Sequence, residues 1–341
     1  METETTAETE SAAARDTTWG LSLIGGAVRQ YRIWLILLLL MLIATIASSG
    51  NFIHLSNLIN DLFIAAPLGI AAIGETLVIL TGGIDLSVAS VWILASVVAG
   101  TAANQGVSPL LALLFALLIG ALAGAINGLV VIFLKVSPLI VTLGMLVMAE
   151  GAARIYTNNN PILSLPSDFQ ALGTTSVGPV PVQVIVWVAM VALMGGIIAR
   201  SVLGKTIYAV GGNPTASRYF GLPVAASLVT VYCLSGVFAA LAGTLQSAYL
   251  NIALPNADLT TLFDVIAGVV IGGASLFGGE GKLVNTMGGV LVVVVIENTL
   301  RIVGVSQLIF QAVVGLIIVG AVYLNVGLRG KAHDRVRQKG I

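Results

Sequence analysis

The sequence is poor in charged residues, and this shortage excludes a soluble protein. Only 9% of its 341 residues are charged, whereas 57% are hydrophobic. A soluble domain carries roughly 25% charged residues, so the polar residues here are too few to cover a soluble surface. The apolar runs are about 20 residues long, which is the length of a membrane-spanning helix and not of a barrel strand. We therefore expect an all-α polytopic membrane protein that contacts the lipid bilayer.

Cysteine, histidine and catalytic motifs are also scarce. Cys233 is the single cysteine, so no intrachain disulfide can form, and the two histidines lie far apart in the sequence, which argues against a zinc or haem site. The run Gly281-Lys282-Leu283 has no Ser or Thr after the lysine, so the chain lacks an ATP-binding P-loop. It also lacks a Gly-x-Ser-x-Gly nucleophile motif. We expect no enzymatic activity, no bound cofactor or metal, and no nucleic-acid partner. The net charge of zero by itself indicates no class of partner.

Ten apolar runs predict about ten transmembrane helices. They lie at about 33–49, 57–80, 86–103, 109–134, 138–154, 180–199, 228–248, 261–277, 283–303 and 307–326. Helix breakers and polar residues between 155 and 179 predict an exposed loop there. We assign the membrane domain to 19–328, a disordered cytoplasmic tail rich in Glu, Thr and Ala to 1–18, and a basic cytoplasmic tail to 329–341.

The distribution of basic residues predicts the orientation of these helices. With ten spans and both termini in the cytoplasm, every Lys and Arg except Arg154 and Arg301 falls in a cytoplasmic segment. Lys and Arg concentrate in the cytoplasmic loops of membrane proteins. We therefore expect both termini to be cytoplasmic.

The second apolar run stops at an unusual polar break. Thr81-Gly82-Gly83 ends the run, Asp85 follows, and Ser87 opens the next run. In lipid each unsatisfied backbone group costs several kcal/mol, so a broken helix survives only inside protein or beside a water-filled cavity. A carboxylate at membrane depth usually faces a bundle interior or a pathway. Alternatively, Asp85 and Ser87 cap the next helix, and the two interpretations are compatible because a helix N-terminus can also be a binding end.

The segment 203–223 predicts a short helix outside the membrane. Gly211-Gly212 suggests a flexible break, and Asn213-Pro214 fits an N-cap followed by proline at the first helical position. Residues 215–220 can then form one or two turns before Gly221 ends them. Such a helix can fit into the groove of a soluble partner, whereas the alternative is an ordinary solvated loop.

Glycine pairs and small residues recur in two further stretches. Gly120, Gly124 and Gly128 share the spacing that allows two helices to pack closely. The block 264–282 contains Gly272-Gly273 and Gly278-Gly279. These glycines serve close packing of helices or line a pore.

Three stretches of the chain, 74–90, 203–223 and 264–282, occur in an order that resembles the ribose/arabinose-type permeases of bacterial ABC sugar importers. The resemblance covers about 30–326 and departs from the usual pattern at Ala89, where glycine is common, at Glu75, and at Glu280, where a basic residue is common. It implies a permease subunit in the bacterial cytoplasmic (inner) membrane that translocates a monosaccharide such as ribose. It further implies a separate ABC ATPase that holds ATP and Mg²⁺, a periplasmic or extracellular sugar-binding protein, and a second permease subunit, either identical or a close paralogue.

The break and the resemblance together give two sets of candidate residues. The substrate pathway set is Glu75, Thr81, Gly82, Gly83, Asp85, Ser87, Asn127 and Asn298. The ATPase coupling set is Gly204, Lys205, Gly211, Gly212, Asn213, Ala216, Arg218 and Gly221. Each of the two asparagines can bond a sugar hydroxyl or bridge two helices.

A proton-coupled secondary transporter of a small polar solute is the alternative function. Its proton relay would use the acidic residues of the apolar runs, namely Glu75, Asp85, Glu150 and Glu297. The energy source distinguishes the two functions, since a secondary transporter works without ATP but stops when an uncoupler collapses the proton gradient.

Overall fold

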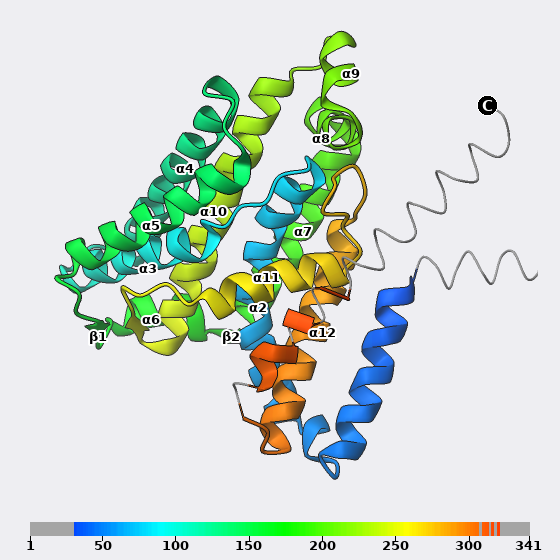
Figure 1. Cartoon of the computed structure of the whole chain (residues 1–341). Coiled ribbons are helices and arrows are strands. Elements are labelled where there is room, and N and C mark those ends of the chain that lie inside the picture. The colour runs from blue at the N-terminus through cyan, green and yellow to red at the C-terminus, as the bar shows by residue number, and fades with distance from the viewer. Residues whose placement is uncertain (1–30, 307–308, 314, 317–318, 321–341) are drawn as a thin grey trace, which may run out of the picture.

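The computed structural model describes residues 31–306, 309–313, 315–316 and 319–320 (Figure 1). The predicted tails at 1–18 and 329–341 lie outside the described residues, as does part of the predicted span 307–326. The regular secondary structure of the described part is helical except for four strands of two residues each. An all-α fold is therefore confirmed for this part of the chain.

The helices and strands follow in this order along the chain. They are the helix Tyr31–Ala47, η1 (Asn51–Ile53), α2 (Leu55–Leu80), α3 (Val88–Asn104), α4 (Pro109–Phe133), α5 (Pro138–Tyr156), β1 (Ile162–Leu163), α6 (Ser167–Thr174), β2 (Ser176–Val177), β3 (Val180–Pro181), α7 (Val182–Arg200), α8 (Val202–Gly212), α9 (Pro214–Tyr219), α10 (Val224–Leu250), β4 (Ile252–Ala253), α11 (Leu259–Ile271) and α12 (Leu283–Ile302).

Six of these helices are long and apolar enough to cross a membrane: α2, α4, α5, α7, α10 and α12. The helix Tyr31–Ala47, α3 and α11 are apolar but shorter. With 13 residues and a rise of 1.5 Å per residue, α11 is about 20 Å long, less than the roughly 30 Å of a hydrocarbon core. Figure 1 shows α3 and α11 running across the direction of α2 and α10. Helix α3 nearly matches the predicted span 86–103, whereas the break after α11 shortens the predicted span 261–277.

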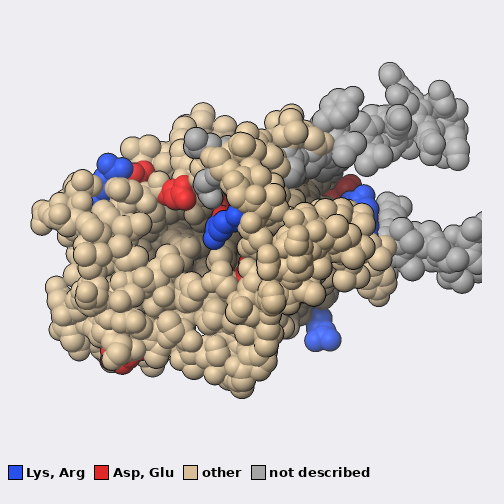
Figure 2. All heavy atoms as spheres, turned by 90° about the horizontal axis from the view of Figure 1, so that it is seen from below, with Lys and Arg blue, Asp and Glu red and all other residues tan. Residues whose placement is uncertain are grey.

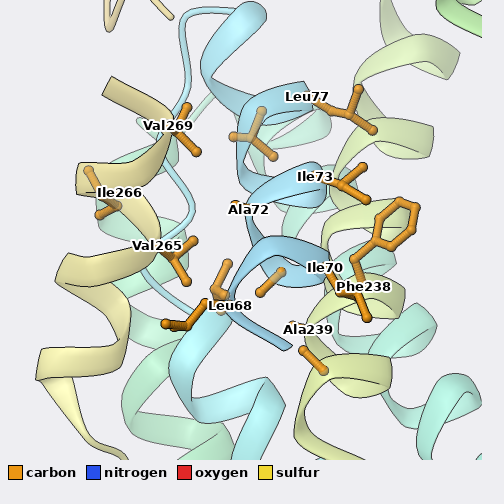
Figure 3. Packing of buried hydrophobic residues seen from close by; sticks show 14 of the residues in the cluster. Leu68, Ile70, Ala72, Ile73, Leu77, Phe238, Ala239, Val265, Ile266 and Val269 are labelled. Atoms are coloured by element: carbon orange, nitrogen blue, oxygen red, sulfur yellow. The ribbon is translucent and has the colours of Figure 1, made fainter. Parts of the chain in front are cut away.

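Helix α2 is the centre of the core. Every residue from 65 to 80 is buried, as expected for a helix that is apolar on all sides. Figure 3 shows Ile73 of α2 facing Phe238 of α10, with Val265 and Val269 of α11 on the other side of α2. Because α2 is enclosed by protein, the break at its end also lies among protein groups.

Helices α4 and α10 pack with their backbones in contact, which confirms the predicted use of the glycine spacing in α4. A Cβ atom added at Gly120 would lie 2.2 Å from the carbonyl oxygen of Gly236, and one at Gly124 would lie 2.1 Å from that of Tyr232. Gly128 likewise faces Val229. Small residues on one helix face allow this approach.

The segment between α5 and α7 is more ordered than the predicted exposed loop. It contains α6, whose Phe169 is fully buried, and Gly173 packs against the α10 backbone. Strand β1 pairs antiparallel with β4, and β2 pairs with β3. The prediction of a simple loop was wrong because the apolar residues Leu165 and Phe169 can be buried against α10 and α3 even though helix breakers surround them.

Candidate functional site: the break, the coupling segment and two hollows

The predicted break after α2 is present. Helix α2 ends at Leu80, and α3 does not begin until Val88. Gly82 has a φ of +82°, a conformation that glycine adopts without steric cost. Residues 81–87, here called the break segment, therefore enter the bundle as a non-helical chain.

Asp85 bonds the backbone and side chains that the break leaves free. Its Oδ1 accepts from the Ser87 amide at 3.0 Å and from the Ser87 hydroxyl at 2.5 Å. Its Oδ2 accepts from the hydroxyl of Ser235 in α10 at 2.8 Å. The carboxylate thus bonds Ser87, the residue that precedes α3, and also ties the break segment to α10. The capping interpretation was wrong for Ser87, which is the N-cap residue of α3 but makes no side-chain capping hydrogen bond.

Two more candidate residues join this buried group, here called the polar cluster. Glu75 Oε1 accepts from the Asp85 amide at 3.2 Å, and Asn127 of α4 donates to the Ser87 hydroxyl at 2.9 Å. Glu75, Asp85, Ser87 and Asn127 are each at most 1% exposed. They connect α2, α4 and the break segment inside the subunit, so Asn127 bridges helices here. Direct contact of these side chains with a substrate stays a prediction.

Sequence reasoning missed the contribution of α10 to the polar cluster. Ser235 donates to Asp85, and the hydroxyl of Tyr232 lies buried without a hydrogen-bond partner in the described part of the chain. A Cβ atom at Gly83 would lie 2.5 Å from the Tyr232 hydroxyl. The available signal was two polar residues three positions apart in an apolar run, which places them on one helix face.

Two hollows lie near the end of the break segment and the start of α3. The first, here called the inner cavity, has a volume of about 590 Å³ and is lined by Ile84 and Leu86 together with Leu139 of α5 and Phe263 of α11. The second, here called the outer pocket, has a volume of about 200 Å³. Its lining includes Ala89 and Trp92 of α3, Gln246 and Ser247 of α10, and Asp258. The residues that follow Asp85 therefore border both hollows, while the Asp85 carboxylate points into the polar cluster.

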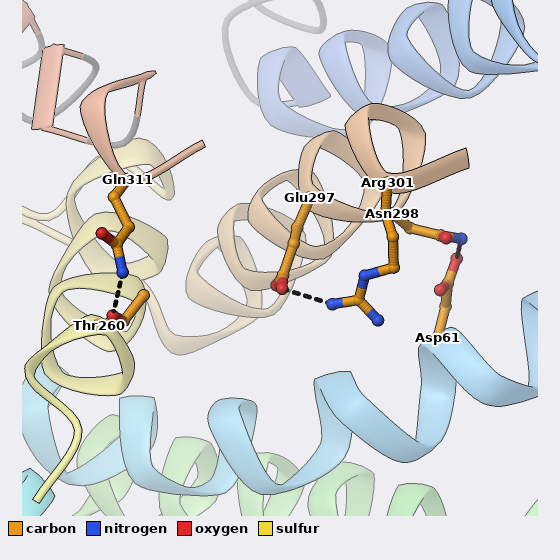
Figure 4. Close-up of polar contacts among 6 residues, drawn as sticks. All are labelled: Asp61, Thr260, Glu297, Asn298, Arg301 and Gln311. Carbon is orange, nitrogen blue, oxygen red and sulfur yellow. Dashed lines mark hydrogen bonds and ion pairs between the residues drawn. The ribbon is translucent and has the colours of Figure 1, made fainter. Parts of the chain in front are cut away.

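Asn298 does not lie with the other pathway candidates. It donates to Asn57 Oδ1 at 3.0 Å and to Asp61 Oδ2 at 2.7 Å (Figure 4). Asp61 precedes Leu80 by 19 residues of α2, about 28 Å along the helix axis. Asn298 thus bridges α12 to the far end of α2.

The acidic residues of the alternative proton relay are also dispersed. Glu150 pairs with Arg154 at 2.5 Å, and Glu297 pairs with Arg301 at 2.7 Å. Figure 4 shows the Glu297–Arg301 pair along α12. Of the four acids, only Glu75 and Asp85 are joined by a hydrogen bond.

The predicted short helix is α9, and its ends are as predicted. Asn213 is the N-cap, with its side chain accepting from the Ala216 amide at 3.0 Å, and Pro214 is the first helical residue. Gly221 follows the helix with a φ of +73°. Figure 1 shows α9 projecting at one end of the molecule. Arg218 lies on its exposed surface.

The prediction of a flexible break at Gly211-Gly212 was wrong, because both residues belong to α8. Earlier in α8, Gly204 allows a tight turn against α7, since a Cβ atom there would lie 1.9 Å from the Ile198 carbonyl oxygen. Lys205 is exposed and lines a third hollow with Lys282.

A side chain from the interior of α8 is hydrogen-bonded to the segment that precedes α12. The Tyr208 hydroxyl donates to the Gly281 carbonyl oxygen at 2.8 Å. A tyrosine phenol is protonated at neutral pH, and burial raises the pKa of the Tyr208 phenol further above its ordinary value.

Glycines from all three singled-out stretches meet at one point, here called the glycine junction. The Gly279 amide donates to the Leu80 carbonyl oxygen at 2.9 Å. A Cβ atom at Gly211 would lie 2.0 Å from that same oxygen and 2.2 Å from the Gly279 nitrogen. A Cβ atom at Gly278 would lie 2.7 Å from both the Gly82 nitrogen and the Gly211 Cα. The end of α8 therefore rests directly on the end of α2, where the break segment begins.

Comparison with known proteins identifies the family. The model of the branched-chain amino acid transport system / permease component family matches residues 57–322. The chain belongs to this permease family. It is 38% identical to the ribose import permease of Bacillus subtilis over 302 residues, covering 88% of this chain and 94% of that protein.

Two further relatives extend this permease similarity. The fructose import permease of Rhizobium meliloti is 35% identical, with 86% of this chain and 85% of that protein covered. A probable ABC transporter permease of Escherichia coli is 35% identical, with 91% and 93% covered. No solved structure is significantly similar to this permease. Its membrane helices and its bacterial relatives make it a multi-pass protein of the bacterial inner membrane.

Proposed function

We propose that this permease is the membrane-spanning subunit of a binding-protein-dependent ABC importer that moves a monosaccharide, such as a ribose-like pentose, into the cytoplasm. The similarity to a ribose import permease along nearly the whole of both chains carries this proposal. ATP and Mg²⁺ bind to a separate ATPase subunit, because this chain has no P-loop. A periplasmic or extracellular sugar-binding protein supplies the affinity for the sugar.

The proposed topology has ten spans and both termini in the cytoplasm. The six long helices supply six spans, and the helix Tyr31–Ala47, α3, α11 and the apolar run 307–326 supply the other four. Helix α9 lies between α7 and α10, which are the sixth and seventh of the ten spans. With the N-terminus in the cytoplasm, the connection between these two spans, and α9 with it, is also in the cytoplasm. The Glu150–Arg154 and Glu297–Arg301 ion pairs then lie on the outer side.

Coupling to ATP hydrolysis runs through α9 and the glycine junction. The exposed Tyr219 and Phe220, which are 88% and 83% exposed, suit a groove of the ATPase. Closure of the ATPase pair moves α9 and, through the continuous helix α8, the backbone contact between Gly211 and Leu80. Because the break segment starts at this contact, a shift there can change access past residues 81–87.

The path for the sugar runs beside the break segment and is closed by a second permease subunit. The support for this placement is that Ile84 and Leu86 line the inner cavity together with the exposed side chains of Leu139 and Phe263. An apolar wall makes only weak contacts with a sugar, which suits a path from which the substrate must leave. The second subunit is either a copy of this chain or a paralogue.

Uptake into proteoliposomes tests the proposal. The permease is purified with the ATPase and binding protein encoded beside it, reconstituted, and given labelled D-ribose with ATP in the compartment that α9 faces. We expect uptake that requires ATP and survives an uncoupler. ATP-independent uptake that stops with the uncoupler would instead support the proton-coupled transporter, and uptake of L-leucine but of no sugar would assign an amino acid substrate.

A further inference from the structure

The outer pocket has a different chemical character from the inner cavity. It combines the ring of Trp92 with the amide of Gln246 and the hydroxyls of Ser96 and Ser247. At about 200 Å³ it is smaller than the roughly 300–1,000 Å³ pockets that hold drug-sized ligands. An aromatic surface with a few oriented polar groups therefore indicates a site for one small molecule that has both polar groups and an apolar face.

Trp92 fixes the orientation of the Gln246 amide. The indole nitrogen donates to Gln246 Oε1 at 2.9 Å. Since the indole N–H can only donate, its partner must be the carbonyl oxygen of the amide. The NH₂ group of Gln246 is then left to donate to another acceptor.

The two serines of the outer pocket offer acceptors. The Ser96 hydroxyl donates to the Ile93 carbonyl oxygen at 2.8 Å, and the Ser247 hydroxyl donates to that of Thr244 at 3.0 Å. Each hydroxyl has one proton and two lone pairs, so its oxygen can still accept. Donors and acceptors on one wall match sugar hydroxyls, which both donate and accept.

The charges at the outer pocket disfavour an anionic ligand. Asp258 is the charged residue of the lining within the described part of the chain, and its Oδ1 accepts from the Thr260 amide at 2.8 Å. The lining includes no Lys or Arg among the described residues. A phosphorylated sugar would find no cation here, whereas an uncharged hydroxyl can donate to the carboxylate.

The position of the outer pocket fits the start of an import path. Gln246 follows Val224, the first residue of α10, by 22 residues, which is about 33 Å along the helix. The outer pocket therefore lies at the end of the molecule opposite α9. Figure 2 shows this end, where charged side chains are few. Thr261 lines the outer pocket and Thr260 lines the inner cavity, so both hollows border the first turn of α11.

We propose that the outer pocket is the first site in the permease to hold the sugar, taking one uncharged monosaccharide ring against Trp92 and the Gln246 amide. This inference rests on the proposed function and adds the residues that contact the substrate. Ala89, which lines the same pocket, lies two residues after the end of the break segment. Movement of the break segment therefore moves the wall of the pocket and passes the sugar to the inner cavity.

Protection of an introduced thiol tests this site. In a Cys233→Ala background, Asn256→Cys places a thiol at the outer pocket and Asn159→Cys places one on the outer surface away from it. The reconstituted complex, whose uptake activity shows that it is folded, is treated with a membrane-impermeant maleimide with and without D-ribose. We expect millimolar ribose to slow labelling of the Asn256→Cys variant severalfold and to leave the Asn159→Cys variant unchanged, with L-leucine protecting neither.

Second substitutions assign the effect to Trp92 and Gln246. Gln246→Leu should raise the ribose concentration needed for half-maximal protection by roughly 2- to 10-fold, as expected for one lost hydrogen bond. Trp92→Leu should do the same, whereas Trp92→Phe keeps the ring and retains more protection. Gln105→Leu, at an exposed residue after α3, is the matched control and should behave like the parent.

The outcomes separate the site from the proposed function. ATP-driven ribose uptake without any protection of the Asn256→Cys variant would overturn the outer pocket and leave the importer in place. Equal protection in the Gln246→Leu and Gln105→Leu variants would also overturn it. Absence of all sugar uptake would instead reject the importer itself, and the site with it.

Discussion

At the scale of single residues, Asp85 holds the break together. It accepts three hydrogen bonds, from the amide and hydroxyl of Ser87 and from the hydroxyl of Ser235. Its own amide is bonded by Glu75. A short side chain that bonds nearby backbone is well suited to start a helix, and here it also reaches a second helix. The Asp85 carboxylate therefore satisfies polar groups at the break, as regular helical hydrogen bonds satisfy the backbone groups elsewhere in α2 and α10.

Replacing Asp85 should destabilise the permease. Asp85→Ala leaves the Ser87 amide and the Ser235 hydroxyl buried without partners, at about 1–3 kcal/mol for each group. We expect a clearly lower melting temperature in detergent, measured by tryptophan fluorescence. Asp85→Asn keeps a carbonyl oxygen and should lose less, and Asp168→Ala, at an exposed residue, serves as the control. Equal melting temperatures for Asp85→Ala and Asp168→Ala would contradict the bonding assigned to Asp85.

At the scale of elements, the contact between α4 and α10 depends on the absence of side chains. Gly124→Ala would place a Cβ atom 2.1 Å from the Tyr232 carbonyl oxygen, and overpacking of this kind costs typically 1–3 kcal/mol. Gly144→Ala in α5 meets nothing within 4 Å and should gain roughly 0.5–1 kcal/mol from helix propensity. Melting temperatures should therefore shift in opposite directions, and a shift in the same direction would argue against close packing of α4 on α10.

The glycine junction offers a second matched pair. A Cβ atom at Gly211 would meet the Leu80 carbonyl oxygen at 2.0 Å, whereas one at Gly212 would meet nothing within 4 Å. Gly211→Ala should reduce sugar uptake much more than Gly212→Ala, since it separates α8 from α2. ATPase activity and uptake are measured on the same proteoliposomes. Normal uptake by the Gly211→Ala variant would remove the glycine junction from the coupling route.

Helix α9 makes a separate prediction for coupling. Arg218→Glu and the double change Tyr219→Ser with Phe220→Ser alter exposed side chains, so the permease should remain folded. We expect both variants to lose copurification with the ATPase and to lose uptake, with an unchanged melting temperature. Tyr31→Ser, at another exposed aromatic residue, is the control. Full uptake by the Arg218→Glu variant would refute the docking role of α9.

At the scale of the whole molecule, orientation in the membrane is the open prediction. In a Cys233→Ala background, Thr215→Cys lies in α9 and Asn159→Cys lies between α5 and β1. In right-side-out vesicles an impermeant maleimide should label the Asn159→Cys variant, and the Thr215→Cys variant only after the membrane is permeabilised. The reverse pattern would invert the proposed topology and place the outer pocket on the cytoplasmic side.

Local features of the fold could be predicted from the sequence because their causes act over a few residues. The break after α2 follows from Gly82 and Asp85, and the start of α9 follows from Asn213 and Pro214, whose bonds reach only three positions ahead. The close packing of α4 likewise followed from glycines spaced one turn apart. The family resemblance, which the sequence indicated from three short stretches, was confirmed by matches along most of the chain.

Other features depended on residues far apart in the chain. The order of the segment containing α6 depends on apolar contacts with α3 and α10, which the local helix breakers conceal. The polar cluster needed Ser235 from α10, and the glycine junction needed Gly211 and Gly279 beside Leu80. Neither the hydrophobic periodicity of the sequence nor its helix-capping residues indicate such long-range contacts.

The sequence by itself thus determined that the chain is a helical membrane permease, where its helices break, and which segment forms α9. Apolar run length and capping residues carry that information, because the cost of exposing backbone groups to lipid is set locally. Only the tertiary structure decided that the side chains of Glu75 and Asp85 point into the polar cluster. It also decided that the residues after Asp85 border the two hollows. The reason is that α2 is enclosed by α10 and α11, so the direction of each side chain at its end is set by packing between helices that the sequence holds far apart.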